Sequence, residues 1–191
     1  MTEVPRRQAR GTARRDAIVR GAADLILSEG PAAVTHRAVA ARAGVPLAAT
    51  TYYFTGLDEL LAAAGQVIVA GWAEHARAAG RGSTADRDRP DAADLVVGAV
   101  LPPGGADDVR GFYEHLVSAG RHPALARAYA DGRDLIDEAV TELLRELGHP
   151  DVTASLVVAV VDGAAVSALS EGRDVRAHAV RLTDELFSAT Q

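Results

Sequence analysis

Cysteine and lysine are absent from this 191-residue sequence, and only eight of its residues are aromatic. Without cysteine, the chain cannot form a disulfide framework, a thiolate metal site or a cysteine nucleophile. No stretch reaches the roughly 20 uncharged apolar residues of a membrane span, and the polar, arginine-rich N-terminus has no apolar segment behind it. We therefore expect a soluble, cytoplasmic protein with no membrane partner.

Alanine is abundant, with 40 residues in a sequence that is 48% hydrophobic. Alanine has the highest helix propensity, and the apolar residues recur at spacings of three and four rather than alternating. The pattern predicts an all-α protein of about nine helices, preceded by a mobile basic arm over residues 1–11. The expected helices cover residues 12–30, 35–43, 47–54, 57–79, 91–101, 107–119, 123–147, 151–170 and 174–189.

Charge divides the sequence near residue 56. Positions 1–55 hold eight arginines and four acidic residues, whereas the remaining 136 positions hold 12 arginines and 22 acidic residues. Because charges more than about 8 Å apart are largely screened at physiological salt, a basic head can bind nucleic acid although the whole chain has a net charge of −6. We expect a DNA-binding domain over 1–56 and a second domain over 57–191.

Two short helices in the basic head have the pattern of a helix-turn-helix. Thr35 suits an N-cap, Gly44 permits a tight turn, and Pro46 suits the start of the next helix. The second helix of such a pair enters the major groove, and its first turns face the base edges. The side chains expected to face the bases are Leu47, Ala48, Ala49, Thr50 and Thr51. None of them can make a bidentate contact to guanine, so direct base readout should be modest.

The head resembles the TetR family of transcriptional regulators. The resemblance is carried by AVTHRAVAARAGV at 33–45, TTYYF at 50–54 and DELL at 58–61. It implies a homodimer that binds a palindromic double-stranded DNA operator, most often as a repressor. It also implies a small-molecule effector of unknown identity that binds in the helical body and releases the DNA.

The resemblance assigns roles to individual residues of the head. Thr35 and Arg37 match phosphate-contacting positions, and Tyr52 and Tyr53 match an aromatic pair that contacts the DNA backbone. Phe54 matches a buried anchor between the third and fourth helices. One departure is Leu57, where the family usually has a lysine. The arm arginines at positions 6, 7 and 10 are candidates to replace the missing lysine charge by binding in the minor groove.

The body is expected to provide the dimer contact. Residues 154–169 contain one charge, Asp162, and are apolar nearly all round, so this helix needs cover on every side. One chain of this size can cover only part of it, and the resemblance places the dimer interface on the last two long helices. The expected interface residues are Leu156, Val160, Gly163, Ala164, Ala168, Leu182 and Leu186.

An effector pocket should lie among the bulky and polar residues of the body, since such pockets are mostly apolar with a few polar groups. The candidates are Trp72, His75, Phe112, Tyr113, Leu116, Tyr129 and Asp162.

Two other classes of protein stay open at this point. A helical-bundle enzyme would show turnover without DNA, and a non-specific architectural DNA-binding protein would show no preference for a palindrome. The sequence contains no nucleophile–base motif, P-loop, dinucleotide fingerprint or His-Glu-x-x-His. We therefore expect no enzyme, no catalytic residues, no metal and no cofactor.

Overall fold

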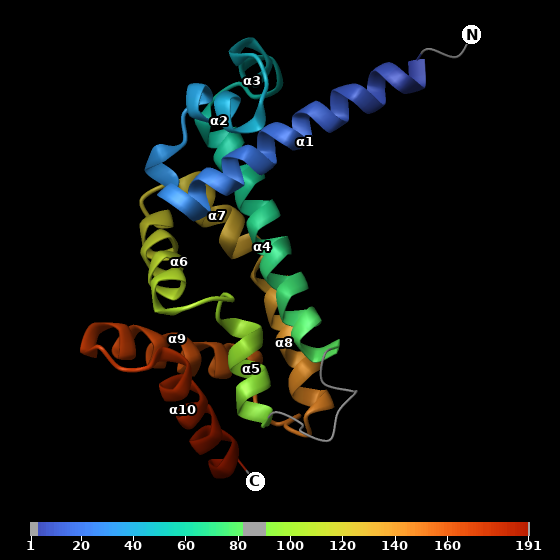
Figure 1. Cartoon of the computed structure of the whole chain (residues 1–191). Helices are drawn as coiled ribbons and strands as arrows, with labels where there is room; N and C mark the ends of the chain where they lie inside the picture. Colours follow the sequence, from blue (N-terminus) through green and yellow to red (C-terminus); the bar gives the residue numbers. More distant parts are fainter. Residues whose placement is uncertain (1–3, 82–90, 191) are drawn as a thin grey trace. The chain divides into compact units, whose positions relative to one another are not determined.

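The computed structural model describes residues 4–81 and 91–190, with the side chains of residues 9–80 and 91–190. All regular secondary structure in these residues is helical (Figure 1). The chain forms two compact units, Met1–Ile68 with Glu114–Asp131, and Val69–Tyr113 with Gly132–Gln191. The boundary between Ile68 and Val69 lies inside the continuous helix Leu57–Arg81, and the functional division expected at residue 56 stays a prediction. The all-α prediction is confirmed for the described residues.

The first unit contains the predicted helix-turn-helix. Its elements are α1 (Val4–Glu29), a 3-10 turn (Pro31–Ala33), α2 (His36–Ala43), α3 (Leu47–Tyr53), the first half of α4 (Leu57–Arg81), the end of α6 (Ala106–Ala119) and α7 (Pro123–Asp131). The second unit contains the remainder of α4 and α6, α5 (Ala92–Val100), α8 (Arg133–Glu146), α9 (Ala154–Glu171) and α10 (Val175–Ala189).

Local chemistry sets the ends of α2 as the sequence predicts. The Thr35 hydroxyl accepts a 3.1 Å hydrogen bond from the Ala38 amide, which satisfies one free donor of the first turn. Gly44 ends the helix with a φ of 64°, a left-handed conformation that favours glycine. A Cβ on Gly21 of α1 would lie 3.2 Å from Ala43, so the glycine allows α1 and α2 to pack closely. The turn and this contact fix the helix-turn-helix on α1.

Two boundaries differ from the prediction. Residues 4–11 are the start of α1 rather than a mobile arm, because α1 begins at Val4 and not at Thr12. The helix expected over 123–147 is divided into α7 and α8 at Gly132, whose helix propensity is lower than that of any residue except proline.

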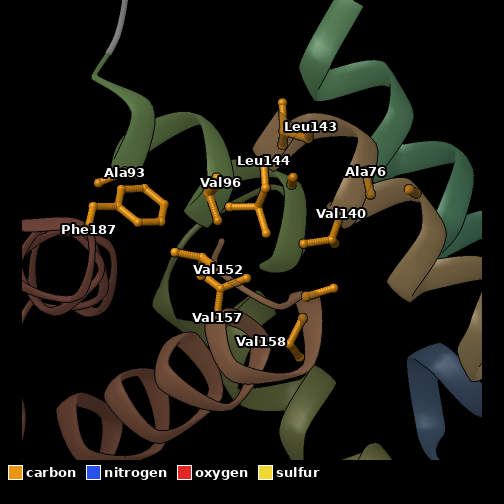
Figure 2. Close-up of a cluster of buried hydrophobic side chains, with 13 residues drawn as sticks. Ala76, Ala93, Val96, Val140, Leu143, Leu144, Val152, Val157, Val158 and Phe187 are labelled. Atoms are coloured by element: carbon orange, nitrogen blue, oxygen red, sulfur yellow. The ribbon is translucent and has the colours of Figure 1, made fainter. Parts of the chain in front are cut away.

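Figure 2 shows the hydrophobic core of the second unit. Leu144 of α8, Val157 of α9 and Phe187 of α10 are almost fully buried and come together with side chains from α4 and α5. The imidazole of His149 stacks on Phe187 with ring centroids 3.9 Å apart. Of the described helices, α9 is long and apolar enough by composition to cross a membrane, as is a bent pair of α3 and α4. In α9 these apolar residues pack against α8 and α10.

Candidate nucleic-acid interface and effector site

The recognition helix α3 exposes an uncharged face. Leu47, Ala48 and Thr51 are exposed and Ala49 is half-buried, as a helix that reads base edges requires. Thr50 is different, because its side chain is fully buried and its hydroxyl donates a 2.8 Å hydrogen bond to the carbonyl of Leu47. The expectation that Thr50 contacts DNA is therefore wrong. One residue in this short helix must face inward to hold α3 on the head.

The two tyrosines at the end of α3 have different environments. Tyr52 is 81% exposed, whereas Tyr53 is half-buried, and their rings meet edge to face with centroids 5.0 Å apart. Phe54 is buried, as the resemblance implies, and the guanidinium of Arg15 lies 5.1 Å from its ring centroid. Phe54 thus anchors the end of α3, whereas the exposed ring of Tyr52 is accessible to a binding partner such as DNA.

The two arginines of helix α2 are both exposed, but they have different partners. Arg37 is exposed, at the position expected to contact phosphate. Arg42 makes a 2.6 Å ion pair with Glu29 and a 3.5 Å ion pair with Asp24, both on α1. The sequence analysis missed this clamp, and no spacing signal was available because the partners lie 13 and 18 positions away. The clamp ties α2 to α1.

The start of α4 is acidic. Leu57 is 39% exposed and is followed by Asp58 and Glu59. The Glu59 carboxylate accepts hydrogen bonds from the amide and hydroxyl of Thr55 at 2.8 and 2.9 Å. The backbone bond, followed by the hydroxyl bond, holds the pKa of Glu59 below its usual value. No cation in the first turn of α4 takes the place of the family lysine.

In the second unit, four of the expected pocket residues form a connected series. The ring of Trp72 meets Phe112 edge to face at 5.2 Å, and Phe112 meets Tyr113 at 5.1 Å. The Tyr113 hydroxyl then donates a 2.8 Å hydrogen bond to Oδ1 of Asp162. Residues from α4, α6 and α9 therefore place three aromatic rings and one carboxylate in succession.

Burial perturbs both ends of this hydrogen bond. It raises the pKa of Tyr113, and the negative charge of Asp162 raises it further. Burial also raises the pKa of the Asp162 carboxyl, while the Tyr113 bond and the positive charge of Arg133 act in the opposite direction. The sequence analysis missed Arg133, which forms a 2.7 Å ion pair with Asp137 four positions later. A partly desolvated carboxylate of this kind favours binding of a cation.

The other pocket candidates have different positions. Nε2 of His75 lies 2.9 Å from the carbonyl of Gly98 and 3.2 Å from that of Leu101, so His75 joins α4 to the end of α5. Leu116 and Tyr129 belong to the first unit. Burial raises the pKa of Tyr129.

The expected dimer residues lie along α9 and α10. Leu156 is 46% exposed, Gly163 is exposed, and Val160, Leu182 and Leu186 are half-buried. A groove of ≈ 530 Å³ runs between the two helices along this face. Ala164 is 2% exposed and lines the floor of this groove, so its contact with a partner stays a prediction. Ala168 is 0% exposed, so the prediction that it contacts a partner is corrected, because its side chain is already covered within the chain. Val166, which is half exposed, was not predicted.

Two short helices joined by the Gly44 turn, the second of them exposed, define a helix-turn-helix DNA-binding protein. Residues 18–64 match the family model of bacterial regulatory proteins of the tetR family, and residues 87–189 match the tetracyclin repressor-like C-terminal domain. The second match covers more than half of the chain. The chain belongs to the TetR family of transcriptional regulators.

Solved structures agree with this assignment. The multidrug binding protein EbrR complexed with ethidium is 32% identical, with a TM-score of 0.64 over 91% of this chain and 98% of that chain. Its complex with proflavin gives 30% identity and a TM-score of 0.63 over 91% and 99%. A TetR family member from Streptomyces coelicolor A3, SCO1917, is 30% identical, with a TM-score of 0.61 over 91% and 97%. No curated protein matches the chain.

Proposed function

We propose that this regulator is a homodimeric repressor that binds a two-fold symmetric DNA operator and is released by a small molecule. Residues 1–56 bind DNA, and residues 57–191 sense the effector and form the dimer. The protein acts in the cytoplasm, where its operator is accessible. The exposed apolar face of α3 carries the proposal, since Leu47 and Tyr52 have no core to cover and fit a groove that presents thymine methyl groups and backbone.

The apolar surface of α9 and α10 supports the dimer. Leu156 and Val166 are large apolar side chains left about half exposed on a helix with almost no charge. A second copy of the same face would cover them, which is the self-complementary arrangement of a two-fold interface. Two recognition helices so joined would contact successive major grooves about 34–36 Å apart.

The effector we propose is a flat aromatic cation. The edge-to-face series of Trp72, Phe112 and Tyr113 offers ring surfaces, and Asp162 offers a negative charge. Tyr113 bonds to Oδ1 of Asp162, so Oδ2 can accept from a ligand cation. Relatives support this class, because EbrR structures contain ethidium, proflavin and malachite green. A ligand that favours the non-binding conformation by about 1–3 kcal/mol would lower DNA affinity about 5- to 150-fold.

Selection of the purified protein against random duplex DNA tests the proposal. We would carry it out at about 150 mM salt, where non-specific attraction is already weakened. Enrichment of a two-fold symmetric site is expected, and its half-site spacing should equal one helical turn or a multiple of it. Enrichment of an asymmetric site, or of none after the protein has been unfolded and refolded to remove bound ligand, would contradict it.

A further inference from the structure

The elements directed at DNA hold few available cations. Helix α3 has no charged residue, and the first turn of α4 is acidic. Helix α2 holds two arginines, of which Arg42 is paired with Glu29 and Asp24. Both arginines of α2 are exposed, but Arg42 is engaged in its two ion pairs, so Arg37 is the better candidate of the two for a phosphate contact. Binding to a polyanion normally uses several such contacts, because each one releases counterions from the DNA.

The missing positive charge lies on the N-terminal part of α1. Residues 4–15 contain five arginines and no acidic residue. The side chains of Arg10, Arg14 and Arg15 are exposed. Figure 1 shows this part of α1, in dark blue, extending beyond α2 and α3 of the same unit. Arg10 and Arg14 are four positions apart, so their side chains leave α1 on the same side.

One contact fixes which face of α1 meets the end of α3. A Cβ on Gly11 would lie 3.6 Å from the hydroxyl of Tyr53. A helix turns about 100° per residue, which places Arg14 about 60° and Arg10 about 100° from Gly11 in the same direction around the axis. Arg20 is about 180° from Gly11, on the opposite face. Arg10 and Arg14 are thus placed beside Tyr53, and Arg20 is not.

We propose that Arg10 and Arg14 of α1 contact the phosphates that flank the groove entered by α3. The contact is to phosphate and not to the minor-groove floor, because an α-helix is about 10 Å across and the minor groove about 6 Å wide. The surface continues the interface that Tyr53 and Arg37 already define. The positive charge of these arginines compensates for the lack of a cation at Leu57 and for the acidic residues at the start of α4. The contact raises the affinity for all duplexes alike, since phosphates carry no sequence information.

The test compares Arg14→Gln with Arg20→Gln in the full chain. Both changes remove one exposed positive charge from α1 and replace it with another good helix former, so the net charge and fold are matched. Binding is measured by fluorescence anisotropy between 50 and 200 mM salt, on the selected operator and on a random duplex of equal length. The random duplex keeps the test valid if no operator is found, so its outcome is separate from that of the proposed function.

Loss of one phosphate contact should reduce the magnitude of the negative slope of log affinity against log salt by about 0.9. We expect this change for Arg14→Gln on both duplexes, a further decrease for the double variant with Arg10→Gln, and no change for Arg20→Gln. Equal slopes for Arg14→Gln and Arg20→Gln would overturn the proposal. So would a loss confined to the operator with an unchanged slope, which would indicate a base contact.

Discussion

The hydroxyl of Tyr113 donates a 2.8 Å hydrogen bond to Oδ1 of Asp162, which joins α6 to the almost uncharged helix α9. The bond satisfies one oxygen of a buried carboxylate that would otherwise be costly to desolvate. Because Asp162 is the one charged side chain between residues 154 and 169, it is also the natural partner for a charged ligand.

Replacement of Asp162 tests the effector proposal. Asp162→Asn preserves the shape and the bond from Tyr113 but removes the negative charge. We expect the affinity for ethidium to fall at least about tenfold, in line with the loss of a charge-assisted contact of about 1.5–3 kcal/mol. Titration of ethidium fluorescence measures this. Asp134→Asn on α8 is the control, since Asp134 is exposed, and equal affinities for the two variants would contradict the assignment.

The Asp162 carboxyl should make the stability of the natural protein depend on pH, with Asp162→Asn as the reference. Burial raises the pKa of Asp162 above its ordinary value of 3.8, so the folded state binds a proton more tightly than the unfolded state. The free energy of unfolding of the natural protein, relative to Asp162→Asn, should therefore be highest below pH 3.8. It should fall as the pH rises through the folded pKa, by about 1.4 kcal/mol for each pH unit that separates the folded and unfolded pKa values. Thermal unfolding across about pH 3–7 measures it, and a relative stability that rises with pH would refute this account.

Tyr52 should matter for binding and not for folding. Its ring is 81% exposed, so Tyr52→Ala removes little buried surface and should change stability by less than about 0.5 kcal/mol. Loss of a backbone contact should weaken binding to operator and random duplex by a similar factor. Calorimetry and anisotropy supply the two readings. Phe54→Ala is the contrasting variant, because removal of this buried ring should cost about 3–5 kcal/mol.

Leu57→Lys should strengthen DNA binding. Leu57 is exposed at the start of α4, where the family usually has a lysine, so the new side chain meets no core. One added phosphate contact should increase the magnitude of the negative slope of log affinity against log salt by about 0.9. Leu27→Lys on α1 provides an exposed leucine for comparison. Equal effects of the two changes would show that general charge, rather than position, is responsible.

Leu156→Glu should dissociate the dimer without unfolding the chain. Leu156 is 46% exposed, so the charge is tolerated in a single copy but would be desolvated against a second one. Sedimentation should show a monomer for this variant and a dimer for the unmodified protein. Val117→Glu, at a more exposed residue of α6, should remain a dimer. A dimeric Leu156→Glu would place the interface elsewhere.

The parts of this fold that depend on local chemistry could be predicted from the sequence. The Thr35 cap, the Gly44 turn and the burial of Phe54 are set by neighbouring residues or by a short motif, and all three are confirmed. The Arg42 clamp could not be predicted, because its acidic partners lie on another helix.

The sequence also could not show which side chains of a short or uniformly apolar helix are buried. Thr50 was expected to face DNA and Ala168 a second copy of the chain, but each side chain is covered within the chain. In α9 nearly every residue is apolar, so the pattern has too little contrast to show which side faces inward. The start of α1 was missed for a related reason: Pro5 and Gly11 indicate irregular structure, yet Pro5 lies in the first turn of α1, where proline is tolerated.

Trp72 gives this protein a built-in optical reporter. It is the one tryptophan in the sequence, and its ring lies 5.2 Å from Phe112 at the end of the series that leads to Asp162. Intrinsic indole emission therefore comes from a single location, beside the proposed effector site. Arrival of a coloured aromatic molecule there should quench that emission by energy transfer, so candidate effectors can be screened on unlabelled protein before any operator is known.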